Sequence, residues 1–312
     1  MGNTYYVFSD WYKSNTDSSV SMGYYLADGS LAWSNLNFSV PASANWTLFT
    51  RGFIVPPNAT SAFFIHFMPH SGWLETDDES MVQAPRPPGF SRPIVSITLD
   101  DGDSSQIPAT QLMDTYGYKS TDYIPTGGIA DGSVWSAAQI LNAYNRGHEI
   151  AAHTVTHPDL TTLSASQLTT EVTQCKTTLE NIIGKGKVTD FATPYGAYNT
   201  NVINALKVAG YASQRSVDEG YNTAADLNPW DIRVQNMLNT TTIQDFQNWI
   251  NNAVSGHYWL VIVYHTIVPD PSADPYGTST TLFQQQLNSI KASGITVLPV
   301  NAALAEVSTQ AH

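Results

Sequence analysis

The fold of this chain is decided by the stretch Pro93-Ile94-Val95-Ser96-Ile97-Thr98-Leu99-Asp100-Asp101-Gly102-Asp103. Its apolar and β-branched first half predicts a buried strand that runs directly into acidic residues. Neighbouring side chains in a regular strand point to opposite faces, so Asp100 and Asp101 can serve one site only where the chain leaves the sheet. Gly102 permits such a turn. The alternative interpretation is a solvated acidic turn.

Downstream of this stretch, strand-like and helix-like segments alternate. The strand-like segments are 94–99, 120–124, 149–152, 188–192, 211–213, 232–235, 259–264 and 296–298. Helix-like periodicity covers 134–146, 164–183, 199–209, 241–254 and 280–293. This alternation predicts an α/β fold with parallel strands, and the number of units predicts a barrel. Barrels of this type carry their chemistry at the C-terminal ends of the strands.

Residues 5–82 follow a different pattern, which predicts an all-β, sandwich-like module. Aromatic and β-branched runs at 5–12, 20–26, 31–40, 46–55 and 62–68 are separated by turn residues. The segment 84–93 is rich in proline and predicts a semi-rigid linker. The predicted organisation is therefore the β module at 1–83, the linker at 84–93 and the barrel at 94–312.

Composition limits the partners of this chain. Its 312 residues carry a net charge of -13, with 13 Lys plus Arg residues and no basic run. We therefore expect no nucleic acid partner, because neutralising phosphates requires clustered cations. A polyanion would be repelled, whereas a neutral sugar polymer would not. No stretch reaches the ~18 apolar residues needed to span a membrane.

The third strand-like segment of the barrel ends in a pair of histidines. The run His153-Thr154-Val155-Thr156-His157 follows 149–152 directly. In a helical turn, positions i and i+4 lie on one side, so both imidazoles would reach one ion. Two histidines and one aspartate form a ligand set suited to zinc, with positions left for water and substrate. The alternative is a pair of surface histidines.

Two further strand ends carry polar groups. The segment 188–192 leads into Thr193-Pro194-Tyr195-Gly196, and the segment 259–264 is followed by His265. At the same end of the barrel as the aspartates, His265 is a candidate general acid. The alternative is a core histidine whose ring nitrogens are satisfied by hydrogen bonds.

As a set, these motifs resemble those of the polysaccharide deacetylases of carbohydrate esterase family 4, which share the NodB homology domain. The resemblance rests on the stretches Thr98-Leu99-Asp100-Asp101-Gly102, His153-Thr154-Val155-Thr156-His157, Ala192-Thr193-Pro194-Tyr195 and Val263-Tyr264-His265. It covers roughly residues 92–306 and implies a distorted (β/α) barrel. It also implies a secreted hydrolase, located outside the cell or at its surface. The lack of an export signal before the first predicted strand is uninformative about this location.

The resemblance assigns a role to each of these groups. A divalent metal, Zn²⁺ first and Co²⁺ or Ni²⁺ as alternatives, would be bound by Asp101, His153 and His157. Asp100 would be the base that deprotonates the attacking water, and the backbone N–H of Tyr195 would stabilise the oxyanion. His265 would protonate the leaving amine or alcohol.

Two departures from the family pattern leave supporting roles open. Ala192 stands where the family usually has an arginine that pairs with the base, and Arg215 and Arg233 are the candidates to replace it. The family's fourth motif, which supports the catalytic histidine, is matched only loosely by Pro229-Trp230-Asp231. Asp231 is therefore a further candidate.

The β module resembles the C-terminal part of carbohydrate-binding jelly rolls through the run 46–57. Its predicted strands are too few for a full sandwich of that type, so we expect a truncated module that covers its apolar face with the barrel or by self-association. Most of its tryptophans are expected in the core, with stacking on sugar rings as the alternative. These tryptophans are Trp11, Trp33, Trp46 and Trp73.

The resemblance implies a metal-dependent hydrolase that removes acetyl groups from a polysaccharide or oligosaccharide. The acetyl group would be N-linked, as in chitin or peptidoglycan sugars, or O-linked, as in xylan. One alternative is a non-catalytic, carbohydrate-binding module of a larger extracellular protein. Another is a metal-dependent hydrolase of a non-sugar amide, because fold alone does not fix the substrate.

Overall fold

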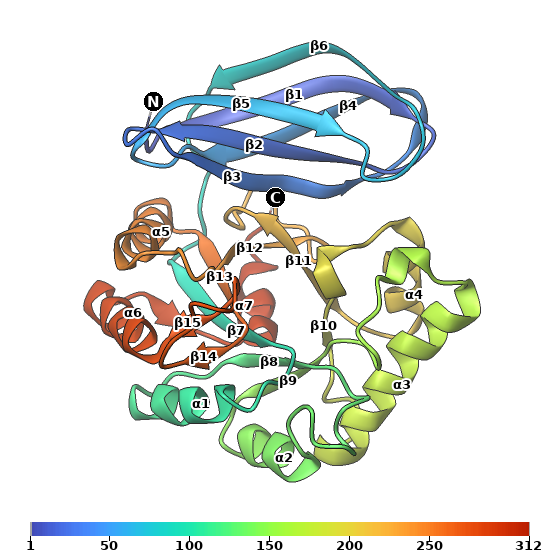
Figure 1. Ribbon diagram of the computed structural model, residues 1–312, viewed down its shortest axis with the longest axis vertical. Coiled ribbons are helices and arrows are strands. Elements are labelled where there is room, and N and C mark those ends of the chain that lie inside the picture. Colours follow the sequence, from blue (N-terminus) through green and yellow to red (C-terminus); the bar gives the residue numbers. More distant parts are fainter. Residues whose placement is uncertain (1, 312) are drawn as a thin grey trace.

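The computed structural model describes residues 2–311, which form a β-sandwich seated on a barrel (Figure 1). The barrel strands are parallel and pair in chain order, and β13 pairs with β7 to close the ring. They are β7 (Ile94–Asp100), β8 (Thr121–Ile124), β9 (Glu149–Ala152), β10 (Asp190–Ala192), β11 (Ser213–Glu219), β12 (Ile232–Asn236) and β13 (Trp259–Tyr264). The short β16 (Thr296–Val297) pairs with the start of β7. The predicted barrel is thus confirmed.

Helices surround the barrel on its outer side (Figure 1). They are α1 (Gln106–Thr115), α2 (Ala137–Asn145), α3 (Ala165–Ile183), α4 (Thr200–Val208), α5 (Ile243–Gly256) and α6 (Thr280–Ser293). Reciprocal capping boxes begin α2 at Ser136, α3 at Ser164 and α5 at Thr242, which satisfies the first free N–H groups of each helix. In the described residues, no helix is long and apolar enough to cross a membrane.

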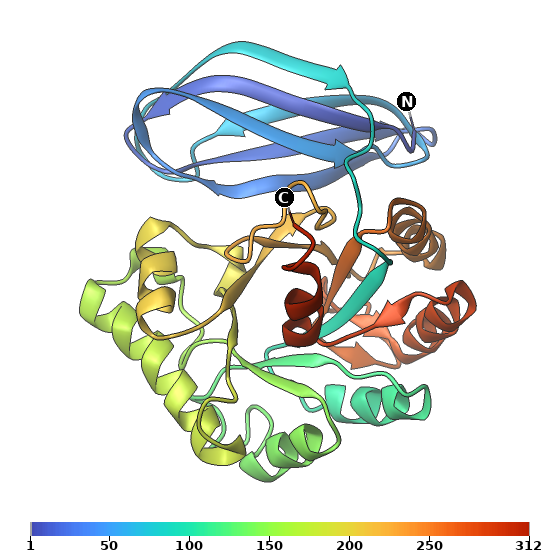
Figure 2. The same ribbon diagram turned by 180° about the vertical axis from the view of Figure 1, so that it is seen from behind.

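The last helix, α7 (Val300–Val307), closes one end of the barrel. Its apolar residues belong to one buried cluster with Ile94 and Trp259, which lie at the beginnings of β7 and β13. Figure 2 shows α7 in front of the barrel. The opposite view, Figure 1, therefore faces the end at which the strands terminate, and two short strands, β14 (Ile267–Val268) and β15 (Thr278–Ser279), lie on that side.

The N-terminal module consists of two antiparallel sheets that face each other, as far as residues 2–311 describe it. One has the order β4 (Ser43–Ile54), β1 (Tyr5–Ser14), β6 (Leu74–Gln83). The other has the order β3 (Leu31–Val40), β2 (Ser18–Leu26), β5 (Ala59–Phe67). Side chains from both sheets, among them Phe8, Met22, Leu36 and Phe53, form a common core.

This internal core corrects two expectations for the module. The prediction that its apolar face needs the barrel or another chain as a cover is wrong, because the acidic strand β6 completes the sheet β4-β1-β6 and the two sheets cover each other. The prediction that most tryptophans are in the core is also wrong. Each of the four alternates with inward-facing neighbours or lies near a turn, and their exposed fractions are 40% for Trp11, 50% for Trp33, 43% for Trp46 and 42% for Trp73.

The sandwich is joined to the barrel by a buried ion cluster. Arg51 of β4 lies 2.6 Å from Asp231, which precedes β12, and 3.4 Å from Asp218 of β11. Asp218 also accepts a hydrogen bond from the backbone N–H of Phe38 in β3 at 2.6 Å. Burial raises the pKa of Asp218 well above its usual range, and the pKa of Asp231 is lowered because Arg51 outweighs the effect of burial. Asp231 therefore serves the junction between the modules.

Candidate metal centre and active site

The two aspartates at the end of β7 are directed to different partners by a turn in the chain. Asp101 has a φ of 72° and Gly102 a φ of 62°, so the backbone leaves the strand in the left-handed region. The Asp100 carboxylate lies next to Arg215, while the Asp101 carboxylate lies next to two imidazoles. The glycine-assisted turn expected from the sequence is present, and it lets consecutive carboxylates take part in one site.

Asp101, His153 and His157 form a cluster that can hold a metal ion. Oδ1 of Asp101 is 3.4 Å from Nε2 of His153 and 3.2 Å from Nε2 of His157, and the two Nε2 atoms are 3.1 Å apart. Ligands about 2.0–2.2 Å from a tetrahedral ion are about 3.3–3.6 Å from one another. The three donor atoms therefore need only small adjustments to bind one divalent cation.

The orientation of His153 also suits metal binding. Its Nδ1 lies 2.8 Å from the carbonyl oxygen of Ala192 at the end of β10. Because a carbonyl can only accept, Nδ1 carries the proton, and Nε2 presents a lone pair toward Asp101 and His157. A hydrogen bond of this kind commonly fixes the tautomer of metal-bound histidines.

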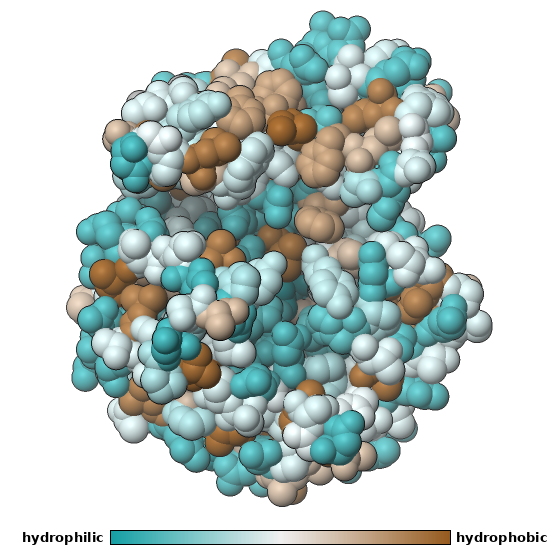
Figure 3. Space-filling model, viewed as in Figure 1, coloured by the Kyte–Doolittle hydropathy of each residue, from teal (hydrophilic) through white to brown (hydrophobic). Residues whose placement is uncertain are grey.

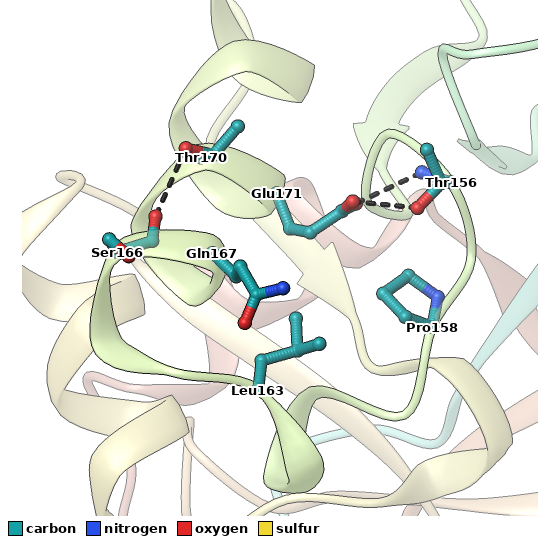
Figure 4. Close-up of a pocket in the computed structure, with 7 residues that line it drawn as sticks. All are labelled: Thr156, Pro158, Leu163, Ser166, Gln167, Thr170 and Glu171. Carbon is teal, nitrogen blue, oxygen red and sulfur yellow. Dashed lines mark hydrogen bonds between the residues drawn. The ribbon is translucent and has the colours of Figure 1, made fainter.

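The loop between the histidines differs from the predicted helical turn. Thr154 has a φ of 69° and His157 a φ of 58°, values outside the right-handed helical region, so a helical turn is wrong as the reason that the i, i+4 pair converges. Instead, Glu171 of α3 accepts a hydrogen bond from the backbone N–H of Val155 at 2.8 Å. It accepts another from the backbone N–H of Thr156 at 2.9 Å (Figure 4). Glu171 thus anchors the loop.

The carboxylate and the imidazoles of the cluster shift one another's pKa values. Burial acts to raise the pKa of Asp101, but hydrogen bonds from His153 and His157 outweigh it and hold this pKa well below its usual value. Burial acts to lower the pKa of His157, but the Asp101 carboxylate outweighs it, and this pKa is raised from 6.5. The cluster therefore favours a cation between its members, either a proton or a metal ion.

Arg215 makes the ion pair with Asp100 that the family's arginine is expected to make. It lies directly opposite Ala192 on the neighbouring strand, and its Nη2 donates a hydrogen bond to Oδ2 of Asp100. The guanidinium is fully buried and lies 4.9 Å from the centre of the Tyr123 ring. Of the two arginines proposed from the sequence, Arg215 contacts Asp100.

The other supporting candidates lie elsewhere. Arg233 pairs with Asp226 at 2.9 Å, away from Asp100. Asp231 pairs with Arg51, so its predicted support of His265 is wrong, because the docked sandwich supplies it with a cation. Within the described residues, Nδ1 of His265 is buried without a hydrogen-bond partner, and the ring lies 5.1 Å from that of Tyr276.

Gln106 was not identified from the sequence, yet it links two of the strand ends. Its amide nitrogen donates to the backbone carbonyls of Asp100, at 2.5 Å, and His265, at 2.7 Å. The side chain is fully buried. A single glutamine at the start of a helix carries no sequence signal for this role, because its partners are backbone atoms and one of them is 159 residues away.

Tyr195 lies at the edge of the cluster. Its φ of 58° marks a tight turn after β10, and its ring lies 4.8 Å from that of His157. The side chain is 62% exposed.

A surface depression of about 310 Å³ lies beyond the His157 loop, next to α3 rather than over the metal ligands (Figure 4). It is lined by Thr156, Pro158, Leu163, Ser166, Gln167, Thr170 and Glu171.

Fold and site together define a (β/α) barrel with a candidate mononuclear metal centre at the C-terminal ends of its strands. Residues 89–213 match the family model for polysaccharide deacetylase. This part of the chain, from the end of the linker to the start of β11, is therefore similar to polysaccharide deacetylases.

Curated relatives and solved structures agree with this assignment. A chitin deacetylase of Pestalotiopsis is 27% identical over 215 residues, which cover 68% of this chain and 64% of that protein. A chitooligosaccharide deacetylase of Azorhizobium caulinodans is 27% identical over 128 residues, covering 41% of this chain and 53% of that protein. The chain thus spans less than two thirds of the length of these relatives.

Among solved structures, the chitin deacetylase of Colletotrichum lindemuthianum has a TM-score of 0.50 and 18% identity, covering 72% of this chain and 94% of that one. A Mycobacterium smegmatis structure described as a polysaccharide deacetylase has a TM-score of 0.55 and 14% identity, with the same coverage. At these identities the structural likeness supports the fold alone.

Proposed function

We propose that this protein is a metal-dependent hydrolase that removes acetyl groups from a polysaccharide or oligosaccharide. The observation that carries the proposal is the triangle of donor atoms from Asp101, His153 and His157 beside a second, separately held carboxylate. A metal site with an adjacent carboxylate fits the hydrolysis of an amide or ester. The names of the relatives, chitin and chitooligosaccharide deacetylase, support a carbohydrate substrate.

The donor set favours Zn²⁺, which commonly binds imidazole and carboxylate ligands with a position left for substrate, and Co²⁺ or Ni²⁺ would fit the same donors. A divalent ion held by these residues would lower the pKa of a water molecule and polarise the acetyl carbonyl. The remaining steps fall to side chains and backbone groups of this chain.

Asp100 is the proposed base. Its Oδ2 accepts a hydrogen bond from Arg215, whereas its Oδ1 is buried and has no partner among the described residues. The bound oxygen fixes the carboxylate, and the free oxygen accepts the proton of the attacking water. Arg215 thus acts as a positioning residue for Asp100. In the family pattern an arginine at the position of Ala192 would have this task.

The tetrahedral oxyanion needs a donor, and the leaving group needs a proton. We assign the first task to the backbone N–H of Tyr195, a contact typically worth ~2.7–4 kcal/mol of transition-state stabilisation. His265 would give a proton to the leaving nitrogen or oxygen as its bond to the acetyl carbon breaks. The products are acetate and a free amine or hydroxyl.

The substrate names of the relatives favour an N-acetylated sugar, although the same chemistry serves an O-acetyl ester. A polymer of this kind lies outside the cell or in its wall, so we also propose an extracellular or cell-surface location. The division of the chain at 84–93 into a β module and a hydrolase domain belongs to the same proposal.

Acetate release from chitin oligomers, peptidoglycan and acetylated xylan tests the function. We expect release from one of these substrates, its loss after chelation, and its return when Zn²⁺ or Co²⁺ is added. His153→Ala should abolish release, whereas the exposed His70→Ala should not. Bound metal without acetate release from any substrate would contradict the proposal and favour a carbohydrate-binding role.

A further inference from the structure

An uncharged, apolar surface covers the outer face of the sheet β3-β2-β5. The strand register places Gly23 between Trp33 and Phe63, and Tyr25 beside Leu31. We call the surface made by Tyr25, Leu31, Trp33, Phe63, Ile65 and Phe67 the apolar platform. Trp33 is 50% exposed and Tyr25 49% exposed. A monomeric protein seldom exposes such a cluster without a binding role.

Gly23 keeps the platform flat. A Cβ atom added at Gly23 would lie 2.3 Å from the Phe63 ring, so that ring rests directly on the backbone of β2. The Phe63 ring is flanked by Trp33, edge-on at 5.3 Å, and by Tyr25 at 5.7 Å. The rings therefore form a continuous row across three neighbouring strands. Beside the row, the hydroxyl of Ser21 donates to the side chain of Asn35 at 2.9 Å, which adds polar groups to an otherwise apolar surface.

The opposite sheet also exposes apolar side chains, among them Leu48 and Val82, but charged groups lie among its aromatic rings. Trp46 is covered by Lys13, whose ammonium lies 4.8 Å from the ring centre and pairs with Glu75 at 2.7 Å. Trp11 stands opposite the acidic Asp77. Charged side chains thus lie over or beside the aromatic rings of that face, whereas the platform contains no charged side chain.

The platform faces the same side of the molecule as the open end of the barrel. Figure 1 shows the sheet β3-β2-β5 in front, together with the end at which the barrel strands terminate. Figure 3, drawn from this direction, shows apolar atoms gathered over the front of the sandwich. A chain-like ligand in the barrel mouth could therefore continue onto the platform without crossing to another face.

We propose that the apolar platform binds a neutral polysaccharide chain whose acetylated sugars are processed at the barrel mouth. The inference rests on the proposed function and narrows its substrate to a polymer. Pyranose rings present apolar C–H faces that stack on aromatic rings, and their hydroxyls can bond to side chains such as Asn35. The net charge of -13 disfavours an anionic polymer.

The test measures binding of the full chain to insoluble chitin and to acetylated xylan, with polygalacturonate as an anionic comparison. We expect binding to at least one neutral polymer and none to polygalacturonate. Trp33→Ala should weaken that binding about tenfold, as expected for loss of an exposed stacking ring. Tyr25→Ala is the second platform variant, in case the first does not fold. Trp11→Ala, on the opposite sheet, is the matched control and should bind as the parent does.

A second measurement separates this inference from the proposed function. Acetate release from a soluble acetylated tetramer depends on the barrel and should be equal in the parent and in Trp33→Ala. Two results would overturn the platform and leave the hydrolase intact, each together with acetate release from the tetramer. The first is a parent protein that binds no polymer. The second is equal polymer binding by the platform variants and the control variant. Loss of polymer binding in Trp33→Ala without acetate release from any substrate would uphold the platform and reject the hydrolase. A parent dimer that Trp33→Ala converts to monomer in light scattering would show that the platform is a contact between two copies.

Discussion

Replacing Arg215 with alanine tests how the site manages without an arginine at position 192. The substitution removes the cation from Asp100, a carboxylate that is only 3% exposed. Breaking a buried pair by deleting one partner typically costs about 3–5 kcal/mol. For a domain of this size, about 2–4 °C of Tm is lost per kcal/mol, so Tm should fall by roughly 6–20 °C.

The same substitution should reduce turnover with metal content unchanged, because Arg215 holds the base and does not contact the metal ligands. Misplacement of a reacting group by about 1 Å costs about 10²-fold, which is the loss we expect in kcat. Acetate release, elemental analysis and calorimetry measure the three quantities. Arg233→Ala is the matched control, since it removes another buried arginine but should leave kcat near that of the parent.

A double substitution tests the positioning role of Arg215 more strictly. Ala192 faces Arg215 across adjacent strands, so Ala192→Arg combined with Arg215→Ala moves the guanidinium to the neighbouring strand while it can still reach Asp100. We expect recovery of much of the lost turnover and Tm. Parental kcat in Arg215→Ala, or no recovery in a well-folded double variant, would refute the positioning role of Arg215.

Four further outcomes are expected. Asp100→Asn should keep the metal but lose ~10²–10⁴-fold in turnover, the usual contribution of a general base, and parental acetate release would move that role to another residue. His157→Ala should abolish metal binding in calorimetric titration while circular dichroism remains native; retained affinity would exclude His157 as a ligand. Glu171→Gln should weaken metal binding about 10–100-fold through the loosened loop, which the same titration measures. Because the pKa of His157 is raised and the metal needs its neutral form, metal affinity should fall as pH drops through a value above 6.5, and pH-independent affinity would contradict this.

The residues at strand ends were predictable because their positions follow from local pattern. An apolar strand that runs into Asp100-Asp101-Gly102, and another that runs into His153, bring side chains to one end of any parallel barrel. Strand order thus predicted that Asp101, His153 and His157 would lie at one end of the barrel, and the resemblance assigned them as metal ligands. The choice between Arg215 and Arg233 could not be made from the sequence, because both lie at the ends of predicted strands. Only the pairing of β10 with β11 brings Arg215 opposite Ala192.

Other features depend on contacts between distant segments. Asp231 resembled part of a motif, but its partner Arg51 is 180 residues away on a module whose docking no local pattern specifies. The strand β6 is acidic along much of its length and lacks the apolar alternation that marks the other strands. Its contribution is to pair with β1 and so to provide the third strand of the sheet β4-β1-β6.

The ion cluster around Arg51 has a consequence for any attempt to use the barrel alone. Without the sandwich, Asp218 and Asp231 would lose their shared cation and become uncovered on β11 and just before β12. Asp218 is three residues beyond Arg215 on the same strand, so a disturbance at the junction would be transmitted toward the base. A barrel prepared in isolation should therefore misreport both stability and turnover. Exchanging the sandwich for another module should succeed only when the replacement provides an arginine at the same point.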